Sequence, residues 1–314
     1  MRAFVFPGQG AQAIGMGKAL SDVYPAAKAV FDEVDDALGE DLSGLIWDGD
    51  IAELTLTANA QPALMATSMA VIHALKAEGV EVADVAFVAG HSLGEYSALA
   101  AAGALSITDA ARLLRARGKA MQDAVPVGVG AMAALLGLDF ETARGVAEEA
   151  ADGEVCEAAN DNDPGQVVVS GHKAAVERAV DIAKGKGAKR ALLLPVSAPF
   201  HCSLMAPAAD AMAEALADVQ IASPAVPVVS NVLAEGVQAP DQIRSLLVEQ
   251  ITGSVRWRES VTYMAAQGVT EIYEIGGGKA LSGMVKRIDR AITTTAVGDP
   301  DGVLAVAEMI NIAT

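Results

Sequence analysis

Cysteine is scarce in this chain of 314 residues. Cys156 and Cys202 are the only two, and no CxxC pair or neighbouring His/Asp cluster with metal-ligand spacing accompanies them. The sequence therefore predicts neither a zinc site nor a disulfide framework. A long apolar run is also lacking at the start, where MRAFVFPGQG reaches a Gly/Pro turn within a few residues. That run is too short for a signal-peptide core or a membrane span, so we expect a soluble, cytoplasmic protein.

Positive charge is in deficit as well. The chain has 22 Lys and Arg against 40 Asp and Glu, which gives a formal net charge of −18. Nucleic acid and anionic membranes are excluded as partners, because neither gains from counterion release at an acidic surface. An anionic partner would need a local basic patch, and each candidate patch is equally consistent with a solvated helix end. The candidates are Lys184, Lys186, Lys189 and Arg190, and near the C-terminus Lys279, Lys286, Arg287 and Arg290.

Apolar residues are abundant, at 52% against 20% charged. Such a chain can bury a large core, so we expect a compact, enzyme-sized unit with an insertion or two subdomains. Short apolar runs at 3–6 and 85–89 predict buried strands, each ended by a glycine-rich turn. An Ala- and Leu-rich stretch at 92–102 predicts a helix, and Thr108 is the expected cap of the next one. Strand followed by helix, repeated, indicates a parallel α/β fold.

The pattern changes between residues 128 and 196. The predicted order there is βαββαβ, which is that of a ferredoxin-like unit. Its expected strands are 131–136, 155–159, 166–170 and 191–196, and its expected helices are 140–151 and 174–184. We therefore predict a small subdomain at 128–196, inserted into a large subdomain formed by 1–127 and 197–314. The large subdomain is expected to continue with a helix at 203–217 and strands at 227–230, 271–275 and 293–297.

A G-x-S-x-G segment, Gly90-His91-Ser92-Leu93-Gly94, lies between a predicted buried strand and a predicted helix. The glycines permit a sharp turn that places Ser92 at its apex. The N-terminus of the following helix offers unpaired N–H groups to a developing oxyanion, and that of Leu93 is the natural first donor. The pattern favours a serine nucleophile over its alternative, a tight structural turn.

The chain has four histidines, and one of them suits a general base. His201 lies on a loop where the chain leaves the predicted insertion, which suits a ring facing a cleft. His91 adjoins the serine on the opposed side of the turn, His73 falls in an apolar helical pattern, and His172 occupies a helix-cap position. Cys202 is expected to be a packing residue, because a thiol and an imidazole on consecutive residues rarely face each other.

Several segments together resemble the malonyl-CoA:acyl carrier protein transacylases over nearly the whole chain. They are Phe6-Pro7-Gly8-Gln9-Gly10, Gly90-His91-Ser92-Leu93-Gly94-Glu95, Arg117-Gly118 with Met121-Gln122, Asn160 to Gly171, Pro199-Phe200-His201, Gln250 with Val255-Arg256-Trp257, and Glu274-Ile275-Gly276-Gly277-Gly278-Lys279. The resemblance implies an α/β-hydrolase-like large subdomain with a parallel sheet, a ferredoxin-like small subdomain, and an active site in the gorge between them.

The resemblance also assigns roles. Ser92 would attack the malonyl thioester, His201 would take its proton, and the N–H groups of Gln9 and Leu93 would form the oxyanion hole. The backbone carbonyl of Gln250 would orient the histidine in place of a carboxylate. No metal or cofactor is implied. The implied partners are malonyl-CoA and acyl carrier protein, and we expect the reaction to supply fatty-acid elongation.

Arg117 would hold the malonyl carboxylate, since a guanidinium fork matches a carboxylate in bidentate fashion. Without the resemblance it could not be chosen over Arg112 and Arg115, and all three would be expected on the helix surface. Two positions depart from the pattern of relatives: Phe200, where some carry a smaller residue, and Gly277, where many have Pro. The bulk of Phe200 should favour malonyl over methylmalonyl groups, and Gly277 is expected to be a neutral turn change.

Two other functions stay open. One is a serine hydrolase of the same fold that releases malonate to water, although such a hydrolase usually has its acid before a histidine late in the chain. The other is a non-catalytic carrier-binding protein, which would have no reason to keep Ser92, His201 and Arg117 together.

Overall fold

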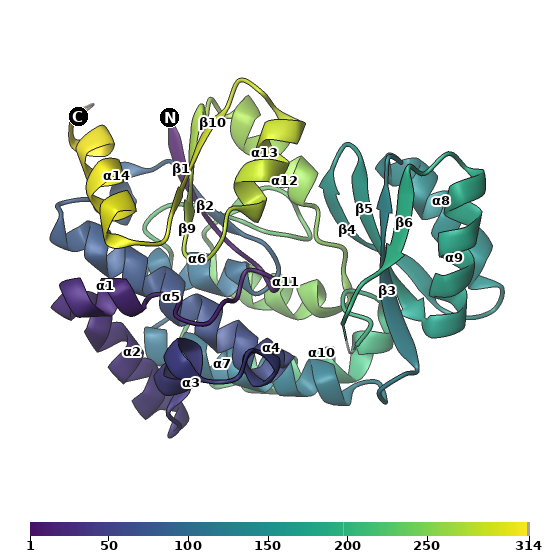
Figure 1. Cartoon of the computed structure of the whole chain (residues 1–314), viewed down its shortest axis with the longest axis horizontal. Coiled ribbons are helices and arrows are strands. Elements are labelled where there is room, and N and C mark those ends of the chain that lie inside the picture. The colour runs from purple at the N-terminus through teal and green to yellow at the C-terminus, as the bar shows by residue number, and fades with distance from the viewer. Residues whose placement is uncertain (197, 313–314) are drawn as a thin grey trace.

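The computed structural model describes residues 1–196 and 198–312, which form two separate β-sheets (Figure 1). The larger sheet has six strands in the order β10-β9-β1-β2-β7-β8. Neighbouring strands are parallel, except that β8 runs antiparallel to β7. The strands are β1 (Arg2–Phe6), β2 (Phe87–Gly90), β7 (Val228–Val229), β8 (Gly236–Val237), β9 (Glu271–Ile275) and β10 (Thr293–Val297).

Helices cover both faces of this sheet, as a mostly parallel sheet requires. Alternate residues of β1 enter two different cores. Phe4 and Phe6 pack with α2, α5 and α7, while Ala3 and Val5 pack with α12 and α13 (Figure 1). These helices are α2 (Pro25–Leu38), α5 (Thr57–Ala77), α7 (Ile107–Asp123), α12 (Trp257–Ala266) and α13 (Ala280–Ile288).

The remaining helices around the larger sheet are shorter or lie further from it. They are α1 (Lys18–Val23), α3 (Leu42–Asp48), α4 (Ile51–Thr55), α6 (Gly94–Ala101), α10 (Ala206–Ala217), α11 (Pro240–Thr252) and α14 (Pro300–Ile312), with 3-10 turns η1 (Val82–Asp84) and η2 (Ser203–Met205). No helix in the described ranges is long and apolar enough to cross a membrane.

The smaller sheet has four antiparallel strands in the order β4-β5-β3-β6. They are β3 (Gly130–Leu136), β4 (Cys156–Asp163), β5 (Gln166–His172) and β6 (Arg190–Leu193). Helices α8 (Phe140–Ala151) and α9 (Lys173–Gly185) pack on one face, against alternate residues such as Leu135 and Val167. The opposite face contributes Met132, Ala134 and Val168 to the core shared with the larger sheet.

Strand β4 joins the two sheets and differs most from expectation. The apolar pattern predicted a strand at 155–159, but β4 continues through the polar run Asn160-Asp161-Asn162-Asp163 with two register shifts. Partners on the elements packed around the larger sheet explain why this polar run can be buried. Asp161 pairs with Arg258 at 2.8 Å, Asp163 pairs with Arg287 at 2.7 Å, and Val255 donates its N–H to the Ala159 carbonyl at 2.8 Å.

Two further expectations are corrected. Ser106, and not Thr108, caps α7: the Ser106 side chain accepts the Asp109 N–H at 3.0 Å, while the Thr108 hydroxyl bonds Glu33 at 2.9 Å. The helix expected at 203–217 is divided into η2 and α10, because Pro207 restricts the chain before it and lacks an N–H. The expected boundary at Ser197 lies outside the described residues.

The turn between β2 and α6 is tightly packed at both of its glycines. A Cβ on Gly90 would lie 1.9 Å from the Gly94 carbonyl carbon, and a Cβ on Gly94 would lie 2.3 Å from the Phe6 carbonyl oxygen. Backbone atoms cannot yield to such contacts without moving the strand end. The two glycines therefore fix how closely α6 crosses β1 and β2.

Replacing Gly90 or Gly94 by alanine should destabilise the protein by about 3 kcal/mol or more, because the added methyl group overlaps backbone atoms. Gly145 is the matched control. It is exposed in α8, and its added Cβ meets nothing within 4 Å, so Gly145→Ala should stabilise the protein by about 0.5–1 kcal/mol. Urea unfolding measures all three. Wild-type stability in Gly90→Ala would contradict the packing described here.

Candidate active site

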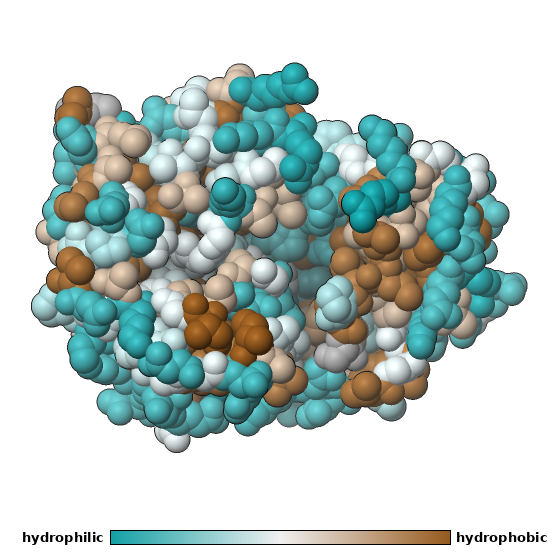
Figure 2. Space-filling view, in the orientation of Figure 1, coloured by the Kyte–Doolittle hydropathy of each residue, from teal (hydrophilic) through white to brown (hydrophobic). Residues whose placement is uncertain are grey.

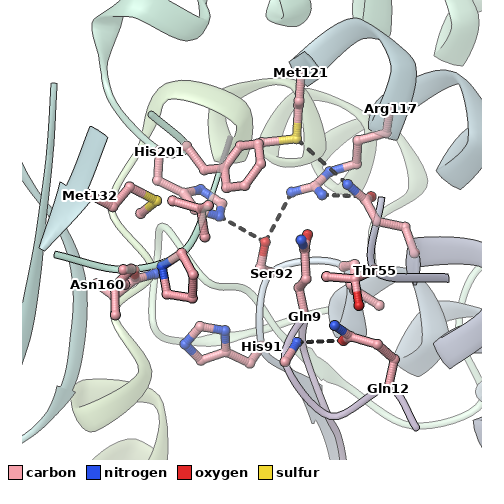
Figure 3. Close-up of a pocket in the computed structure, with 17 residues that line it drawn as sticks. Gln9, Gln12, Thr55, His91, Ser92, Arg117, Met121, Met132, Asn160 and His201 are labelled. Carbon is pink, nitrogen blue, oxygen red and sulfur yellow. Dashed lines mark hydrogen bonds between the residues drawn. The ribbon is translucent and has the colours of Figure 1, made fainter. Parts of the chain in front are cut away.

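A cavity of about 320 Å³ lies between the two sheets and is lined by segments of both parts (Figure 3). The lining residues come from the loop after β1, the β2–α6 turn, helices α4, α5 and α7, strands β3 and β4, and the segment that follows β6. They are Gln9, Gly10, Gln12, Thr55, Gln61, His91, Ser92, Leu93, Arg117, Met121, Met132, Asn160, Leu194, Pro195, Val196, Phe200 and His201.

Ser92 occupies the apex of the β2–α6 turn with a φ of +54°, which is uncommon for a residue other than glycine. Its backbone groups are held on both sides. The Ser92 N–H donates to Asn231 Oδ1 at 2.7 Å, and the Ser92 carbonyl accepts from Gln250 Nε2 at 3.0 Å. Strained residues persist only where their surroundings over-determine them. Asn231 and Gln250 provide that restraint and leave the Ser92 hydroxyl pointing into the cavity (Figure 3).

Ser92 Oγ lies 2.7 Å from His201 Nε2. The other ring nitrogen, Nδ1, lies 2.9 Å from the backbone carbonyl of Gln250. A carbonyl only accepts hydrogen bonds, so Nδ1 carries the proton and Nε2 presents its lone pair to the serine. His201 is itself in the left-handed region, with a φ of +58°. The structure thus brings together Ser92, His201 and Gln250, with a carbonyl where a triad would have a carboxylate.

The imidazole of His201 is buried beside a cation. Burial first, and then the charge of Arg117, lower the pKa of His201 to about 3. The ring is therefore neutral at about pH 7 and is able to accept a proton from Ser92.

Arg117 extends from α7 into the cavity and is 1% exposed. Its Nη1 donates to Gln61 Oε1 at 2.8 Å, and its Nη2 donates to Gln250 Oε1 at 2.8 Å and to Ser92 Oγ at 3.1 Å. The guanidinium carbon lies 5.7 Å from the centre of the Tyr96 ring. Within residues 1–196 and 198–312, Arg117 forms no ion pair. A buried cation with only neutral partners beside a serine is suited to bind an anionic group.

The two neighbouring arginines differ from each other. Arg112 is exposed, as expected, and its Nε donates to the Ala37 carbonyl at 3.1 Å. The surface position expected for Arg115 is wrong. That side chain is buried, pairs with Glu40 at 2.5 Å and donates to the Ala58 carbonyl at 2.8 Å, because α7 packs this face against the start of α5.

Gln9 and Leu93, the expected oxyanion donors, both line the same cavity as Ser92. None of the hydrogen bonds found in the described residues takes up the backbone N–H of Gln9 or of Leu93. Gln9 is placed by its side chain, which donates to Thr57 Oγ1 at 3.2 Å. The loop after β1 packs against the turn, since a Cβ on Gly8 would lie 2.8 Å from the His91 carbonyl oxygen.

No pattern in the sequence indicated several of the residues that form the site. Gln61 holds Arg117 from the second turn of the apolar helix α5, where a single buried amide is a weak signal. Asn231 follows the two-residue strand β7, and no local pattern marks it. Glu95, whose side chain is buried, belonged to the motif but had no assigned role. Each acts through partners distant in sequence, which a pattern of neighbours does not reveal.

Among the described residues, the other histidines and the cysteines form no hydrogen bond with Ser92, His201 or Arg117, although His91 lines the cavity. His91 Nε2 bonds Asn162 Oδ1 at 2.9 Å, and His172 Nδ1 accepts the Val155 N–H at 2.9 Å. Both cysteines are free and buried, and burial raises the pKa of Cys156 to about 12 and that of Cys202 to about 11. These thiols therefore remain protonated at about pH 7.

A model of the acyl transferase domain family matches residues 3–287. The malonyl CoA-acyl carrier protein transacylase of Bacillus subtilis is 51% identical over 300 residues, covering 95% of this chain and 94% of that protein. The chain belongs to the malonyl-CoA:acyl carrier protein transacylase family. The Escherichia coli K12 transacylase is 49% identical over 307 residues, covering 98% of this chain and 99% of that protein.

Solved structures of the family agree with this assignment. An acyl-carrier-protein S-malonyltransferase from Bartonella henselae superposes with a TM-score of 0.97 at 54% identity, covering 99% of each chain. A malonyl-transacylase solved in complex with its type II PKS acyl-carrier protein gives a TM-score of 0.95 at 44% identity, covering 98% of this chain and 99% of that one.

The ring of His201 should not titrate between about pH 5 and pH 8, because its pKa of about 3 keeps it neutral throughout that window. Histidine-selective NMR at successive pH values measures this directly. An unperturbed histidine would instead change charge near pH 6.5. Resonances of His201 that move with a midpoint in that region would contradict the buried, cation-adjacent environment.

Proposed function

We propose that this chain transfers a malonyl group from malonyl-CoA to the phosphopantetheine thiol of acyl carrier protein through a malonyl-serine intermediate. One observation carries the proposal: an unpaired buried cation, Arg117, lies within hydrogen-bond distance of the same Ser92 oxygen that His201 contacts. A serine and histidine alone would suit many esters. A guanidinium beside them selects an acyl group that ends in a carboxylate, and malonyl differs from acetyl in that group.

In the first half-reaction, Ser92 Oγ attacks the thioester carbonyl carbon while His201 Nε2 takes the hydroxyl proton. The N–H groups of Gln9 and Leu93 receive the oxyanion of the tetrahedral intermediate. The carbon–sulfur bond then breaks, and His201 returns the proton to the coenzyme A sulfur. In the second half-reaction the carrier thiol gives its proton to His201 and its sulfur attacks the serine ester. The bond between the acyl carbon and Ser92 Oγ then breaks, and the proton returns to Ser92 Oγ. The Gln250 carbonyl keeps the imidazole in the required tautomer throughout.

We also propose that the larger sheet belongs to an α/β-hydrolase-like subdomain formed by 1–127 and 197–314, and the smaller sheet to an inserted ferredoxin-like subdomain at 128–196. The mostly parallel six-stranded sheet and the four-stranded antiparallel sheet with two helices on one face support this division. It places the active site at the junction, where both parts contribute residues to one cavity. The cytoplasmic location stays a prediction.

Carrier protein should dock where cations remain free of partners. Lys184 pairs with Asp181, Lys186 with Glu149 and Arg287 with Asp163, so these three are less suited to docking than the sequence suggested. Within the described ranges, no ion pair engages the other basic residues of the two patches, Lys189, Arg190, Lys279, Lys286 and Arg290.

The surface next to these cations supports docking at the cavity entrance. Figure 2 shows a hollow between the larger part on the left and the smaller sheet on the right, with apolar side chains gathered on the side of the smaller sheet. Strand β6, which begins at Arg190, carries two exposed leucines, Leu192 and Leu193. A basic and partly apolar surface suits an acidic carrier protein that presents a pantetheine arm.

Replacing Ser92 by alanine should abolish the malonyl adduct that the wild type forms with malonyl-CoA, because no nucleophile then remains next to His201. Intact-protein mass measures the adduct. Ser97→Ala is the matched control: Ser97 is buried in α6 with no hydrogen-bond partner found in the described chain, so the adduct should persist. In the wild type the adduct should disappear when carrier protein is added. An adduct that decays equally fast in water alone would instead indicate a hydrolase.

Replacing Arg117 by alanine should leave the malonyl carboxylate buried without a partner, at a cost of about 2–5 kcal/mol in kcat/KM. Acetyl transfer should change far less, because acetyl-CoA presents no carboxylate to this pocket. Arg112→Ala is the control, since Arg112 is exposed on the same helix and should affect neither thioester. The measurement is kcat/KM for both thioesters. A parallel fall for malonyl and acetyl would make Arg117 a structural residue only.

A further inference from the structure

Glu95 is a buried carboxylate that the mechanism above does not use. It lies in the first turn of α6, three residues after Ser92, and is 3% exposed. One oxygen, Oε2, accepts the Gln250 Nε2–H at 2.7 Å and the Asn231 N–H at 3.1 Å. No lysine or arginine of the described chain forms an ion pair with it. A carboxylate this buried needs either a countercharge or a proton.

The amide of Gln250 connects Glu95 to Arg117. Its Nε2 donates to Glu95, while its Oε1 accepts from Arg117 Nη2 at 2.8 Å. A carboxylate only accepts and a guanidinium only donates, so the amide between them can take just one orientation. Glu95, Gln250 and Arg117 thus form a continuous series of hydrogen bonds, and none of these three residues is more than 3% exposed.

The two charges at the ends of this chain act on each other. Arg117 has only neutral groups in direct contact, namely Gln61, Gln250, Ser92 and the Tyr96 ring. Glu95 contributes electrostatically to the pKa of Arg117, and Arg117 to that of Glu95. Buried charges are screened far less than surface charges, so an interaction through one amide remains substantial.

We propose that Glu95 is the resident countercharge of Arg117 and sets how tightly the pocket holds a carboxylated acyl group. This inference rests on the proposed function. A malonyl carboxylate must compete with Glu95 for the same guanidinium, so the ionised glutamate weakens malonyl binding. The balance is useful to a transferase, because an acyl group held too tightly in the ground state would resist transfer in the second half-reaction.

The variant Glu95→Gln isolates the charge. The glutamine amide oxygen can replace Oε2 and accept both existing hydrogen bonds, while the negative charge is lost. Burial raises the pKa of Glu95 to about 7, so the measurement belongs at about pH 8, where the wild-type carboxyl group is ionised. The Ser92→Ala background prevents acyl transfer, so that calorimetry reports binding of malonyl-CoA and acetyl-CoA without chemistry.

In that background, Glu95→Gln should tighten malonyl-CoA binding on the order of tenfold and leave acetyl-CoA binding unchanged or weaker. The magnitude corresponds to two charges on the order of 10 Å apart at an effective dielectric constant of about 20. Unchanged or weaker malonyl-CoA binding would overturn the proposal. If the Ser92→Ala parent itself failed to distinguish the two thioesters, the proposed function would fail instead, so the two failures are distinguishable.

Glu274→Gln is the matched control for the loss of a buried carboxylate. Glu274 is fully buried at the end of β9, where it accepts the Leu281 and Ser282 N–H groups at 3.0 and 2.7 Å, and it does not contact Arg117. Its replacement should leave the ratio of malonyl-CoA to acetyl-CoA affinity as in the parent. An equal change of that ratio in both glutamine variants would show a general effect of lost charge and would overturn the role assigned to Glu95.

Discussion

Gln250 holds the site together with both its backbone and its side chain. Its carbonyl fixes the His201 tautomer, and its amide bonds the Ser92 carbonyl, Glu95 and Arg117. A single residue of α11 therefore determines which way His201, Ser92 and Arg117 face. Because the residue is fully buried, these contacts are formed without competition from water. The geometry of the site depends on α11 keeping its position against the β2–α6 turn.

That position depends in turn on how the two sheets are joined. The polar residues of β4 meet arginines of α12 and α13, and Asn162 on the same strand bonds His91 next to Ser92. Val255, two residues before α12, bonds the β4 backbone with both its N–H and its carbonyl. One wall of the cavity is therefore attached to the other by hydrogen bonds and by ion pairs whose carboxylates are buried. Leaving a buried polar group between the two sheets without a partner would cost free energy. These contacts therefore favour one arrangement of the two sheets over others.

The sequence was most informative where function depends on neighbouring residues. The strand–Ser92–helix turn and the loop histidine follow from local patterns, and the strands at 271–275 and 293–297 match to the residue. Arg117 could be singled out only through resemblance, since spacing along α7 does not say that Arg115 meets Glu40 while Arg117 enters the cavity. The polar half of β4 was missed for the opposite reason: its residues have low strand propensity, and partners distant in sequence compensate them. Likewise, the contacts of Asn231 and Gln61 are with residues distant in sequence, so only the folded structure shows their roles.

Electrostatics links specificity to base strength in this site. Arg117 lowers the pKa of His201, which keeps the imidazole neutral but also makes it a weaker base. A carboxylate that binds Arg117 offsets this charge, so a malonyl group bound there should raise the proton affinity of His201. Acetyl provides no such offset. Glu95 acts on the same guanidinium, which the amide of Gln250 connects to it. Under the proposed function, the charge balance around Arg117 therefore bears on both the acyl group that is held and the basicity of His201.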